Sequence, residues 1–331
     1  MTTRTLLNLL KLIKTNKKFL IVSHISPEGD AIGSSIALAL GLEKMGKSVY
    51  VLNRDPVPDI LKFLPSAKIV TRKIPSGKFD VMFIVDCPNM ERTGLKNLRA
   101  KITVTIDHHL LLSQVIPKQS LNLIDPKASA TGELVYKLLH SLHVTIDKAI
   151  ATNLYTAILT DTGGFRYSNT TPESLKIASR LVAAGADPWE ITKEVYENFS
   201  FNRLRLVSLC LPTIEKKGKI TSITVTRDMF KKTKTSIEDT ESIVDFPRQI
   251  KGSEVALLFR EDRKNLYKIS LRSKGKVNVA KIAKTFGGGG HANAAGCKLT
   301  GSLTEVKGNI FKAVENAINL QNTFKNKDKK T

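Results

Sequence analysis

The chain has 331 residues, of which 41% are hydrophobic and 25% are charged. This composition is typical of a soluble globular protein, and the length suffices for two domains that each bury a core. The formal net charge of +22 favours a polyanionic partner, such as RNA, DNA, nucleotides or an acidic membrane surface, although solubility alone accounts for part of the surplus. The charge therefore supports an anionic partner without identifying it.

The cysteines and the first residues of the chain indicate the cellular compartment of the protein. Cys87, Cys210 and Cys297 lie far apart and form no CxxC pair, which speaks against a zinc–thiolate site or a disulfide framework and fits a reducing compartment. Four lysines between Lys11 and Lys18 interrupt the first apolar run, so this segment is predicted to be an amphipathic helix rather than a signal peptide or membrane span. We expect a cytoplasmic protein that has no membrane partner.

In chain order, the first half alternates short apolar runs with helical patterns. Strands are predicted at residues 19–23, 48–52, 81–85 and 102–106. Helices are predicted at residues 31–45, 131–142 and 148–159, and another follows Pro172, which suits a first helical turn. Strands that are nearly continuously apolar and are separated by helix-length segments are expected of a parallel sheet covered on both faces.

The pattern changes near residue 216. Strands are predicted at 220–225, 254–259 and 267–271, followed by helices at 279–285 and 303–320. The fold class is therefore α/β, with a parallel-sheet domain flanked by helices and a smaller α/β domain that contains a mixed sheet. We expect a catalytic domain at 1–190, a helical linker at 191–215, a substrate-binding domain at 216–322 and a disordered lysine-rich tail at 323–331.

Acidic and histidine residues follow three of the predicted strands. His24, Glu28 and Asp30 follow the first strand in SHISPEGDAIGS. Asp86 ends the third strand in FIVDC. The fourth strand ends with Asp107, His108 and His109 in VTIDHH, and Asp161 in LTDTGGF ends a predicted helix. Because the carboxyl ends of parallel strands line one crevice, these side chains should meet there.

Carboxylates packed this closely repel one another and are unfavourable to desolvate, a conflict that divalent cations remove. Mixed His and Asp ligands suit Mn²⁺, Fe²⁺, Co²⁺ or Zn²⁺, while Mg²⁺ prefers oxygen ligands. Two ions about 3.5–4 Å apart support in-line hydrolysis of a phosphoester. Taken alone, His24 could be a hydrogen-bonded core residue, and Asp86 or Asp161 a turn or helix cap. The coincidence of four acid-bearing sites at strand or helix ends favours a metal site.

At these residues the chain resembles the DHH phosphoesterases. The segments SHISPEGDAIGS, VDC, DHH and DTGGF occur in the order of the four sequence blocks of that family, and SLRSKGKVNVAKIAKTFGGGGHANAAG resembles the DHH-associated substrate-binding domain. The most similar subgroup comprises bifunctional oligoribonucleases that shorten very short RNAs and dephosphorylate 3′-phosphoadenosine 5′-phosphate (pAp). The resemblance covers nearly the whole chain.

The resemblance implies specific roles for the acidic and histidine residues. One metal would be held by His24, Glu28 and Asp86, and a second by Asp30, Asp86, His108 and Asp161, with Asp86 bridging. Asp107 would orient a histidine, and His109 would face the scissile phosphate. The family usually has aspartate where this chain has Glu28, and the extra methylene of glutamate shifts the carboxylate at the first metal site. The expected ions are two Mn²⁺, with Mg²⁺ or Co²⁺ as alternatives.

The substrate is expected to contact the second half of the chain. In the family, the arginine of SLRS and the histidine after the glycines contact phosphate, which implies Arg272 and His291 here. Glycines 287–290 could let backbone amides approach a phosphate, which places Gly288, Gly289 and Gly290 in the substrate site, although a glycine-rich turn alone is usually only a turn. With 6% aromatic residues and no basic stripe interleaved with them, the chain lacks the pattern of an extended stacking platform for single strands.

Three functions are consistent with these observations. The leading hypothesis is two-metal hydrolysis of short RNA oligonucleotides and pAp. A second keeps the metals and changes the substrate to a cyclic dinucleotide; pyrophosphate is disfavoured because related pyrophosphatases carry a different second domain. A third is a non-catalytic basic RNA-binding protein with a decayed metal site, which Glu28 alone suggests. The resemblance also implies a homodimer.

Overall fold

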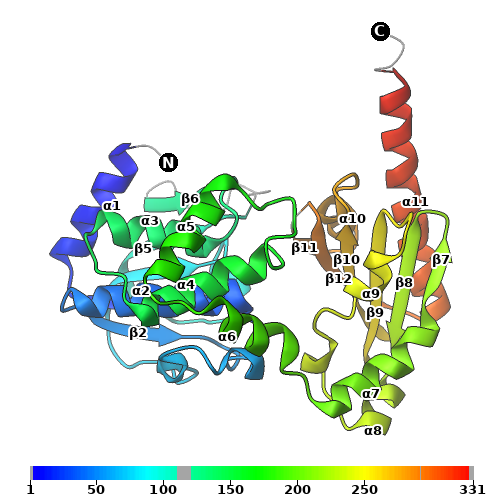
Figure 1. The fold of residues 1–331 in the computed structure, drawn as a ribbon, viewed down its shortest axis with the longest axis horizontal. Coiled ribbons are helices and arrows are strands. Elements are labelled where there is room, and N and C mark those ends of the chain that lie inside the picture. Colours follow the sequence, from blue (N-terminus) through cyan, green and yellow to red (C-terminus); the bar gives the residue numbers. More distant parts are fainter. Residues whose placement is uncertain (1–2, 110–120, 291, 328–331) are drawn as a thin grey trace. The chain divides into compact units, whose positions relative to one another are not determined.

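A computed structural model describes residues 3–109, 121–290 and 292–327, and it confirms the predicted α/β class (Figure 1). Contacts within the chain divide it into two compact units, Met1–Asn198 and Phe199–Thr331. Each unit has its own sheet and its own hydrophobic core. They are therefore described separately.

The sheet of unit 1 is parallel throughout the described residues and has the strand order β3-β2-β1-β4-β5-β6. Its strands are β1 Lys18–Val22, β2 Ser48–Leu52, β3 Val70–Thr71, β4 Phe79–Val85, β5 Ala100–Asp107 and β6 Leu121–Ile124. Strands β3 and β6 were not predicted, because they are two and four residues long and depend on pairing with longer neighbours. The strand order reverses between β1 and β4, where open α/β sheets bind ligands.

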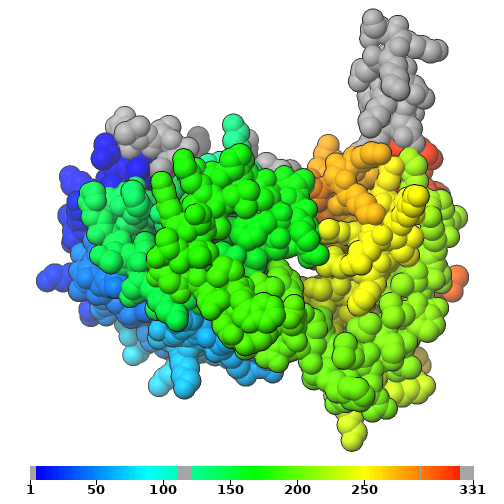
Figure 2. All heavy atoms as spheres, viewed as in Figure 1, coloured from blue at the N-terminus to red at the C-terminus, as the bar shows by residue number. Residues whose placement is uncertain are grey.

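Helices cover one face of this sheet. They are α1 Thr3–Thr15, α2 Gly29–Lys44, α3 Thr131–Ser141, α4 Lys148–Asp161, α5 Pro172–Ala183 and α6 Pro188–Thr192. The unit also contains the 3₁₀ turns η1 Asp59–Leu61, η2 Ala67–Ile69 and η3 Glu91–Thr93 and the π-helical turn η4 Lys193–Glu197. Side-chain hydrogen bonds cap the N-termini of some of these helices. Asp147 accepts a hydrogen bond from Ile150 N at 3.0 Å, and Thr171 forms a capping box with Ser174 ahead of α5. Figure 2 shows the green segment from α4 to α6 forming the near surface of unit 1.

The two faces of this sheet are buried differently. Phe19, Ile21 and Phe83 belong to the large core formed with α1 to α5, and the rings of Phe19 and Phe83 stack with centroids 6.0 Å apart. Val22 and Ile84 lie in a smaller cluster with residues of the segment 87–98. The strands are thus covered on both faces, as predicted, but the second cover is this irregular segment around η3 rather than a helical layer.

Unit 2 contains a mixed sheet of order β11-β12-β10-β9-β8-β7, in which β8 and β9 are parallel and the other pairs are antiparallel. Its strands are β7 Glu215–Lys217, β8 Ile220–Val225, β9 Val255–Arg263, β10 Leu266–Ser273, β11 Gly289–Gly290 and β12 Ala294–Thr300. Its helices are α7 Phe201–Cys210, α8 Arg227–Thr233, α9 Asp245–Gln249, α10 Val279–Thr285 and α11 Leu303–Lys327, with 3₁₀ turns η5 Leu211–Thr213 and η6 Glu238–Thr240.

Both faces of this second sheet are also covered. Phe259 and Ile269 pack with α10 and α11, and the Phe259 ring stacks on Phe311 with centroids 6.3 Å apart. On the opposite face, Leu258 and Val225 pack with Leu206 of α7. Strand β12 was not predicted, because its sequence AAGCKLT is rich in small residues and reads as a continuation of the glycine loop.

The last helix, α11, differs from its predicted extent. It continues to Lys327, beyond the predicted end at residue 320 and into the segment predicted to be disordered. No glycine or proline follows Gly308, and lysine and glutamine are good helix formers, so nothing in the sequence ends the helix earlier. None of the helices in the described residues combines the length and the hydrophobicity that a bilayer crossing requires.

Candidate metal centre

The predicted histidines and carboxylates of unit 1 lie together at the carboxyl ends of β1, β4 and β5. His24 and Asp30 follow β1, Asp86 follows β4, and His108 follows β5; all four are at least 90% buried. Asp161 joins them from the last residue of α4. Because β1 and β4 are the strands between which the sheet order reverses, these side chains occupy the position where this architecture binds ligands.

His108 lies between three carboxylates. Its Nε2 atom is 3.7 Å from Asp30 Oδ2, 3.7 Å from Asp86 Oδ1 and 3.5 Å from Asp161 Oδ2. Its Nδ1 atom lies 3.2 Å from the carbonyl oxygen of Ala128, which can only accept, so Nδ1 donates and Nε2 is the nitrogen that faces the carboxylates, with a lone pair available whenever the ring is neutral. A backbone carbonyl that fixes one nitrogen in this way is the usual support for a histidine that ligates a metal through the other.

His24 repeats this arrangement on the other side of Asp86. Its Nδ1 donates to the carbonyl oxygen of Ile25 at 2.9 Å, and its Nε2 lies 3.5 Å from Asp86 Oδ2. Thus one oxygen of Asp86 faces His108 and the other faces His24. The carboxylate of Asp86 therefore lies between two imidazoles that face different oxygens of it.

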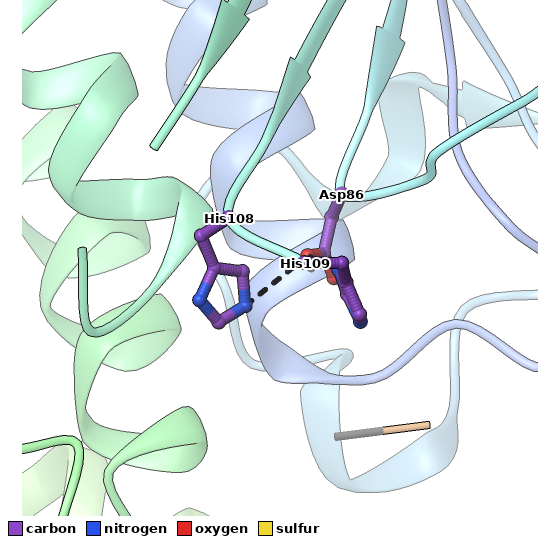
Figure 3. A group of neighbouring side chains, drawn as sticks. All are labelled: Asp86, His108 and His109. Atoms are coloured by element: carbon purple, nitrogen blue, oxygen red, sulfur yellow. Dashed lines mark ion pairs between the residues drawn. The ribbon is translucent and has the colours of Figure 1, made fainter. Parts of the chain in front are cut away.

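The backbone of Asp86 is itself unusual. Its φ is +55°, in the left-handed region that non-glycine residues seldom adopt, and Thr131 Oγ1 donates to its Oδ1 at 2.9 Å. Backbone conformations of this kind persist only where the surroundings impose them, and they cluster at functional sites. Figure 3 shows the result: the side chain of Asp86, which follows β4, and those of His108 and His109, which follow β5, lie together just past the strand ends.

His109 is held differently from the other two histidines. Its Nδ1 donates to Asp107 Oδ1 at 2.6 Å, and its backbone N–H donates to the same oxygen at 3.1 Å. Although His109 Nδ1 also lies 3.6 Å from Asp86 Oδ1, the bond to Asp107 occupies that nitrogen. Asp107 is fully buried, and its Oδ2 has no hydrogen-bond partner in the described part of the chain. Its main contact is therefore with His109.

Asp30 is held by residues that sequence reasoning did not assign to the site. The backbone N–H groups of Thr131 and Gly132, at the start of α3, donate to its two oxygens at 2.6 and 2.9 Å, and Ser34 Oγ donates at 2.8 Å. A carboxylate at a helix N-terminus is stabilised by the free amides and the helix dipole. The predicted helix start at residue 131 was the available signal, but its pairing with Asp30 spans a hundred residues of chain.

Burial and mutual repulsion perturb the protonation of the cluster. Burial raises the pKa of Asp161 to about 6, and burial together with the charge of Asp86 raises the pKa of Asp30 well above its usual value. Burial lowers the pKa of His108, but the charges of Asp161, Asp30 and Asp86 outweigh it and raise the value to about 9. The pKa of His24 likewise rises to about 9, because Asp86 outweighs burial. The carboxylates thus need positive charge close by.

The residues present fit a divalent metal. In the part of the chain that the structure describes, the ion pairs of Asp30, Asp86 and Asp161 are made with histidines rather than with lysine or arginine. Asp30, His108 and Asp161 each offer one ligand atom, and these atoms lie within 4.8 Å of one another; the same holds for Asp86, His108 and His109. Imidazole nitrogen with carboxylate oxygen is a donor set for Mn²⁺, Fe²⁺, Co²⁺ or Zn²⁺.

Glu28 stands apart from this buried group. It occupies the N-cap of α2 without a side-chain capping bond, and its side chain is exposed. Its charge nevertheless raises the pKa values of His24 and Asp161, although it is not the largest influence on either. Glu28 is therefore an exposed residue close enough to the cluster to influence both His24 and Asp161 through its charge. The other two described histidines, His140 and His143, are exposed.

The predicted substrate residues lie in unit 2. Arg272 is on β10, where its Nη1 donates to the carbonyl oxygen of Leu271 at 3.3 Å. Gly287 N and Gly288 N donate to carbonyl oxygens at the end of α10, so these amides complete the helix rather than facing a ligand. His291 lies outside the described residues.

Two of the three predicted loop glycines have a packing reason to be glycine. A Cβ at Gly288 would lie 2.1 Å from the carbonyl oxygen of Gly296, and one at Gly290, whose φ is +140°, would lie 2.4 Å from that of Ala294. Gly289 has open space at its Cβ position. The tight-turn explanation therefore accounts for Gly288 and Gly290, and Gly289 is the glycine whose surface a ligand could approach.

The chain is similar to known proteins in both halves. The model of the DHH family, N-terminal domain, matches residues 18–158, and that of the DHHA1 domain matches residues 221–320. Over 301 residues the chain is 33% identical to the bifunctional oligoribonuclease and PAP phosphatase NrnA of Thermus thermophilus, which covers 89% of this chain and 88% of that protein. The chain belongs to the DHH family.

Other comparisons agree with this membership. The protein of the same name from Bacillus subtilis is 26% identical over 301 residues, covering 88% of this chain and 92% of that one. A solved structure of an exopolyphosphatase-related protein from Bacteroides fragilis has a TM-score of 0.86 at 30% identity, covering 97% of this chain and 98% of that chain. The chain is a metal-dependent hydrolase that acts on phosphoester bonds.

Proposed function

We propose that this protein hydrolyses short oligoribonucleotides and pAp, with two Mn²⁺ ions as its cofactor. The observation that carries the proposal is Asp86, whose two oxygens face His108 and His24 at the sheet position where α/β proteins bind ligands. The names of the relatives from Thermus thermophilus and Bacillus subtilis support the choice of substrates. Imidazole and carboxylate donors support Mn²⁺ over Mg²⁺, and Co²⁺ is the next candidate.

In this proposal the ligands divide into two sets that share Asp86. His24, Glu28 and Asp86 hold one ion, and Asp30, Asp86, His108 and Asp161 hold the other. Glu28, whose side chain is exposed, would supply the longest carboxylate ligand of the first set. When bound, the ions polarise the phosphoryl oxygens and lower the pKa of water. Orienting the substrate, stabilising charge and donating a proton are left to the side chains of the protein.

His109 and Asp107 form the proposed catalytic pair. The 2.6 Å bond to Asp107 fixes the orientation of the His109 ring, and this carboxylate together with Asp86 raises the pKa of the imidazole although burial opposes it. A protonated His109 stabilises negative charge on a phosphoryl oxygen, and it can donate a proton to the departing oxygen. In unit 2, Arg272, the glycines Gly288, Gly289 and Gly290, and His291 are the proposed substrate contacts, with Arg272 suited to a bidentate phosphate contact.

A comparison of substrates tests the proposal. The purified protein is incubated with Mn²⁺ and, in separate reactions, a ribodinucleotide, pAp, a cyclic dinucleotide and pyrophosphate. We expect mononucleotide release from the dinucleotide and phosphate release from pAp, both abolished by a chelator and restored by Mn²⁺. Stable dinucleotide and stable pAp would remove the proposed substrate class, whereas faster turnover of the cyclic dinucleotide would replace it.

The compartment and the assembly are further parts of the proposal. The cysteines Cys87, Cys210 and Cys297 are free and buried, which suits a reducing cytoplasm. The homodimer is proposed from the family resemblance, and sedimentation of the full chain would reveal its mass.

A further inference from the structure

The loop after α4 returns the chain to Asp161, the last residue of that helix. Residues 163–165 all have positive φ, between +58° and +72°, and two backbone N–H groups further along the loop donate to the carbonyl oxygen of Thr162, each at 3.0 Å. Left-handed backbone is unfavourable for a residue such as Phe165, so the surrounding contacts must impose this tight turn. The turn places Asn169, eight residues along the chain, beside Asp161.

The side-chain amide of Asn169 donates to both the side chain and the backbone of Asp161. Its Nδ2 atom lies 3.2 Å from Asp161 Oδ2, 3.1 Å from the carbonyl oxygen of Asp161 and 3.0 Å from the carbonyl oxygen of Ser129. Carbonyl and ionised carboxylate oxygens can only accept, so the NH₂ group of the amide must face them. Asp161 Oδ2 is also the oxygen that lies 3.5 Å from His108 Nε2. Asn169 therefore fixes the oxygen with which Asp161 faces His108.

The position of Asp161 makes this hydrogen bond important. Asp161 ends α4, where the helix dipole is unfavourable to a carboxylate, whereas Asp30 accepts from the free amides at the start of α3. Among the residues that the structure describes, Asn169 is the one hydrogen-bond donor to the Asp161 carboxylate. The orientation of this carboxylate therefore depends on the Asn169 amide.

Ser129, the other partner of Asn169, is itself held in place. It is fully buried, and its backbone N–H and its Oγ donate to Glu133 Oε2 at 3.1 and 3.0 Å. Glu133 is also buried, and Lys137 Nζ donates to its other oxygen at 2.6 Å. A buried polar network in which both oxygens of the carboxylate are bonded is rigid. The carbonyl oxygen of Ser129 is thus a fixed anchor for Asn169.

The segment around Ser129 also holds the rest of the second ligand set. Residues 128–132 supply hydrogen-bonding partners to the three other members of this set, which are His108, Asp30 and Asp86. Asp161 is connected to the same segment through Asn169, which donates to both Ser129 and Asp161. All four proposed ligands of one ion are thereby tied to a single short stretch of chain.

We propose that Asn169 is a positioning residue for the second ion, because its amide ties Asp161 to the segment 128–132 that holds the other ligands. The inference rests on the proposed function and deepens it, since it identifies what sets the geometry of one of the two ion sites. In the first set, His24 is oriented by the carbonyl oxygen of Ile25 instead. Loss of the Asn169 amide should therefore weaken one ion site and spare the other.

The test is a titration of the metal-free full-length protein with Mn²⁺, followed by calorimetry and by the electron paramagnetic resonance signal of the ion. It compares the wild type with Asn169→Ala, with Asn169→Leu, which keeps the volume but not the donor, and with the control Asn198→Ala, which removes an exposed amide bonded to Glu194. We expect the wild type and the control to bind two ions alike. In both Asn169 variants one site should weaken by about 10–100-fold, the usual effect of losing a residue that orients a metal ligand, while the other site keeps its affinity.

Circular dichroism separates this effect from a loss of the fold. Unchanged binding at both sites in a folded Asn169 variant would overturn the proposal, and so would equal weakening of both sites. If Asn169→Ala and Asn169→Leu both fail to fold, Asn169 supports the fold rather than one ion site, and the proposal is again wrong.

The proposed function fails in a different way. A wild type that binds two Mn²⁺ ions but leaves a ribodinucleotide and pAp intact would refute the proposed substrates, and the titration would still decide the role of Asn169. A wild type that binds no Mn²⁺ would refute the proposed cofactor, and the same titration with Co²⁺ would then decide the role of Asn169. Binding of neither ion would overturn both proposals.

Discussion

At the scale of single residues, Asp86 is the central side chain of the candidate metal centre. Its left-handed backbone directs the carboxylate toward two histidines, each of which has its other nitrogen fixed by a backbone carbonyl. Apart from glycine, asparagine is among the uncharged residues that tolerate this backbone conformation best. The substitution Asp86→Asn therefore separates the charge of this side chain from its backbone geometry.

We expect Asp86→Asn to lower turnover of a ribodinucleotide by about a thousandfold, because the proposed ligand to both ions loses an anionic oxygen and its charge, a loss of about 4 kcal/mol in the transition state. Rates with Mn²⁺ and the circular dichroism spectrum of the variant provide the measurement. Asp59→Asn, at the exposed start of η1, is the matched control and should retain full activity. Near wild-type turnover of Asp86→Asn would exclude a bridging role.

The pair formed by Asp107 and His109 predicts coupled behaviour. Asp107→Asn should lower turnover by about 10–100-fold, the usual effect of losing the residue that orients a functional histidine. His109→Gln should have at least as large an effect, and the double variant should be no worse than His109→Gln, because Asp107 acts through that ring. Bound Mn²⁺, measured by atomic absorption, should stay at the wild-type level in Asp107→Asn. Additive losses in the double variant would show that the two residues act independently.

At the scale of elements, the contact between α2 and α4 positions Asp30 and Asp161. Gly33 lies at this contact, and a Cβ there would be 2.4 Å from the carbonyl oxygen of Asn153 in α4. A backbone atom cannot move aside as a flexible side chain can. We expect Gly33→Ala to destabilise unit 1 by about 1–3 kcal/mol, the range for inserting a methyl group into a packed core. Hydrogen exchange measured by mass spectrometry would locate the loss in α2 and α4.

The same substitution should have the opposite effect in α11. Gly308 is an exposed helical residue, and a Cβ there would meet no atom within 4 Å. Gly308→Ala should stabilise unit 2 by about 0.5–1 kcal/mol, because alanine loses less conformational freedom on forming a helix. Denaturant unfolding followed by circular dichroism would measure this gain. Destabilisation by Gly308→Ala would mean that this face of α11 is occupied in solution.

At the scale of the whole molecule, the net charge of +22 raises the question of how many phosphates are bound at once. A substrate held by two phosphates should lose about sevenfold in affinity between 50 and 200 mM salt, since single strands follow a slope of about 0.7 per phosphate contacted. The KM of a 5′-phosphorylated ribodinucleotide across this salt range provides the measurement. A much steeper dependence, increasing with RNA length, would indicate an extended nucleic-acid track and favour the RNA-binding hypothesis.

Much of the metal centre was predictable because it follows from strand ends. A parallel sheet brings the residues after its strands to one edge, so His24, Asp86 and His108 could be grouped before any distance was known. The hydrogen bonds from the start of α3 to Asp30 could not be predicted, because backbone N–H groups leave no signature in a sequence. Strands β3, β6 and β12 were missed for a related reason, since short or glycine-rich strands are stabilised by pairing with distant segments.

By itself the sequence determined the α/β class, the family resemblance and which residues to propose for the metal centre, because periodicity and motif order are local properties of the chain. Only the tertiary structure decided which oxygen of Asp86 faces which histidine, that Gly288 and Gly290 are required by packing, and that Asn169 joins Asp161 to Ser129. These facts depend on which residues pair across neighbouring strands and on how closely distant segments of the chain approach one another. Both are set by packing between segments that are far apart in the sequence.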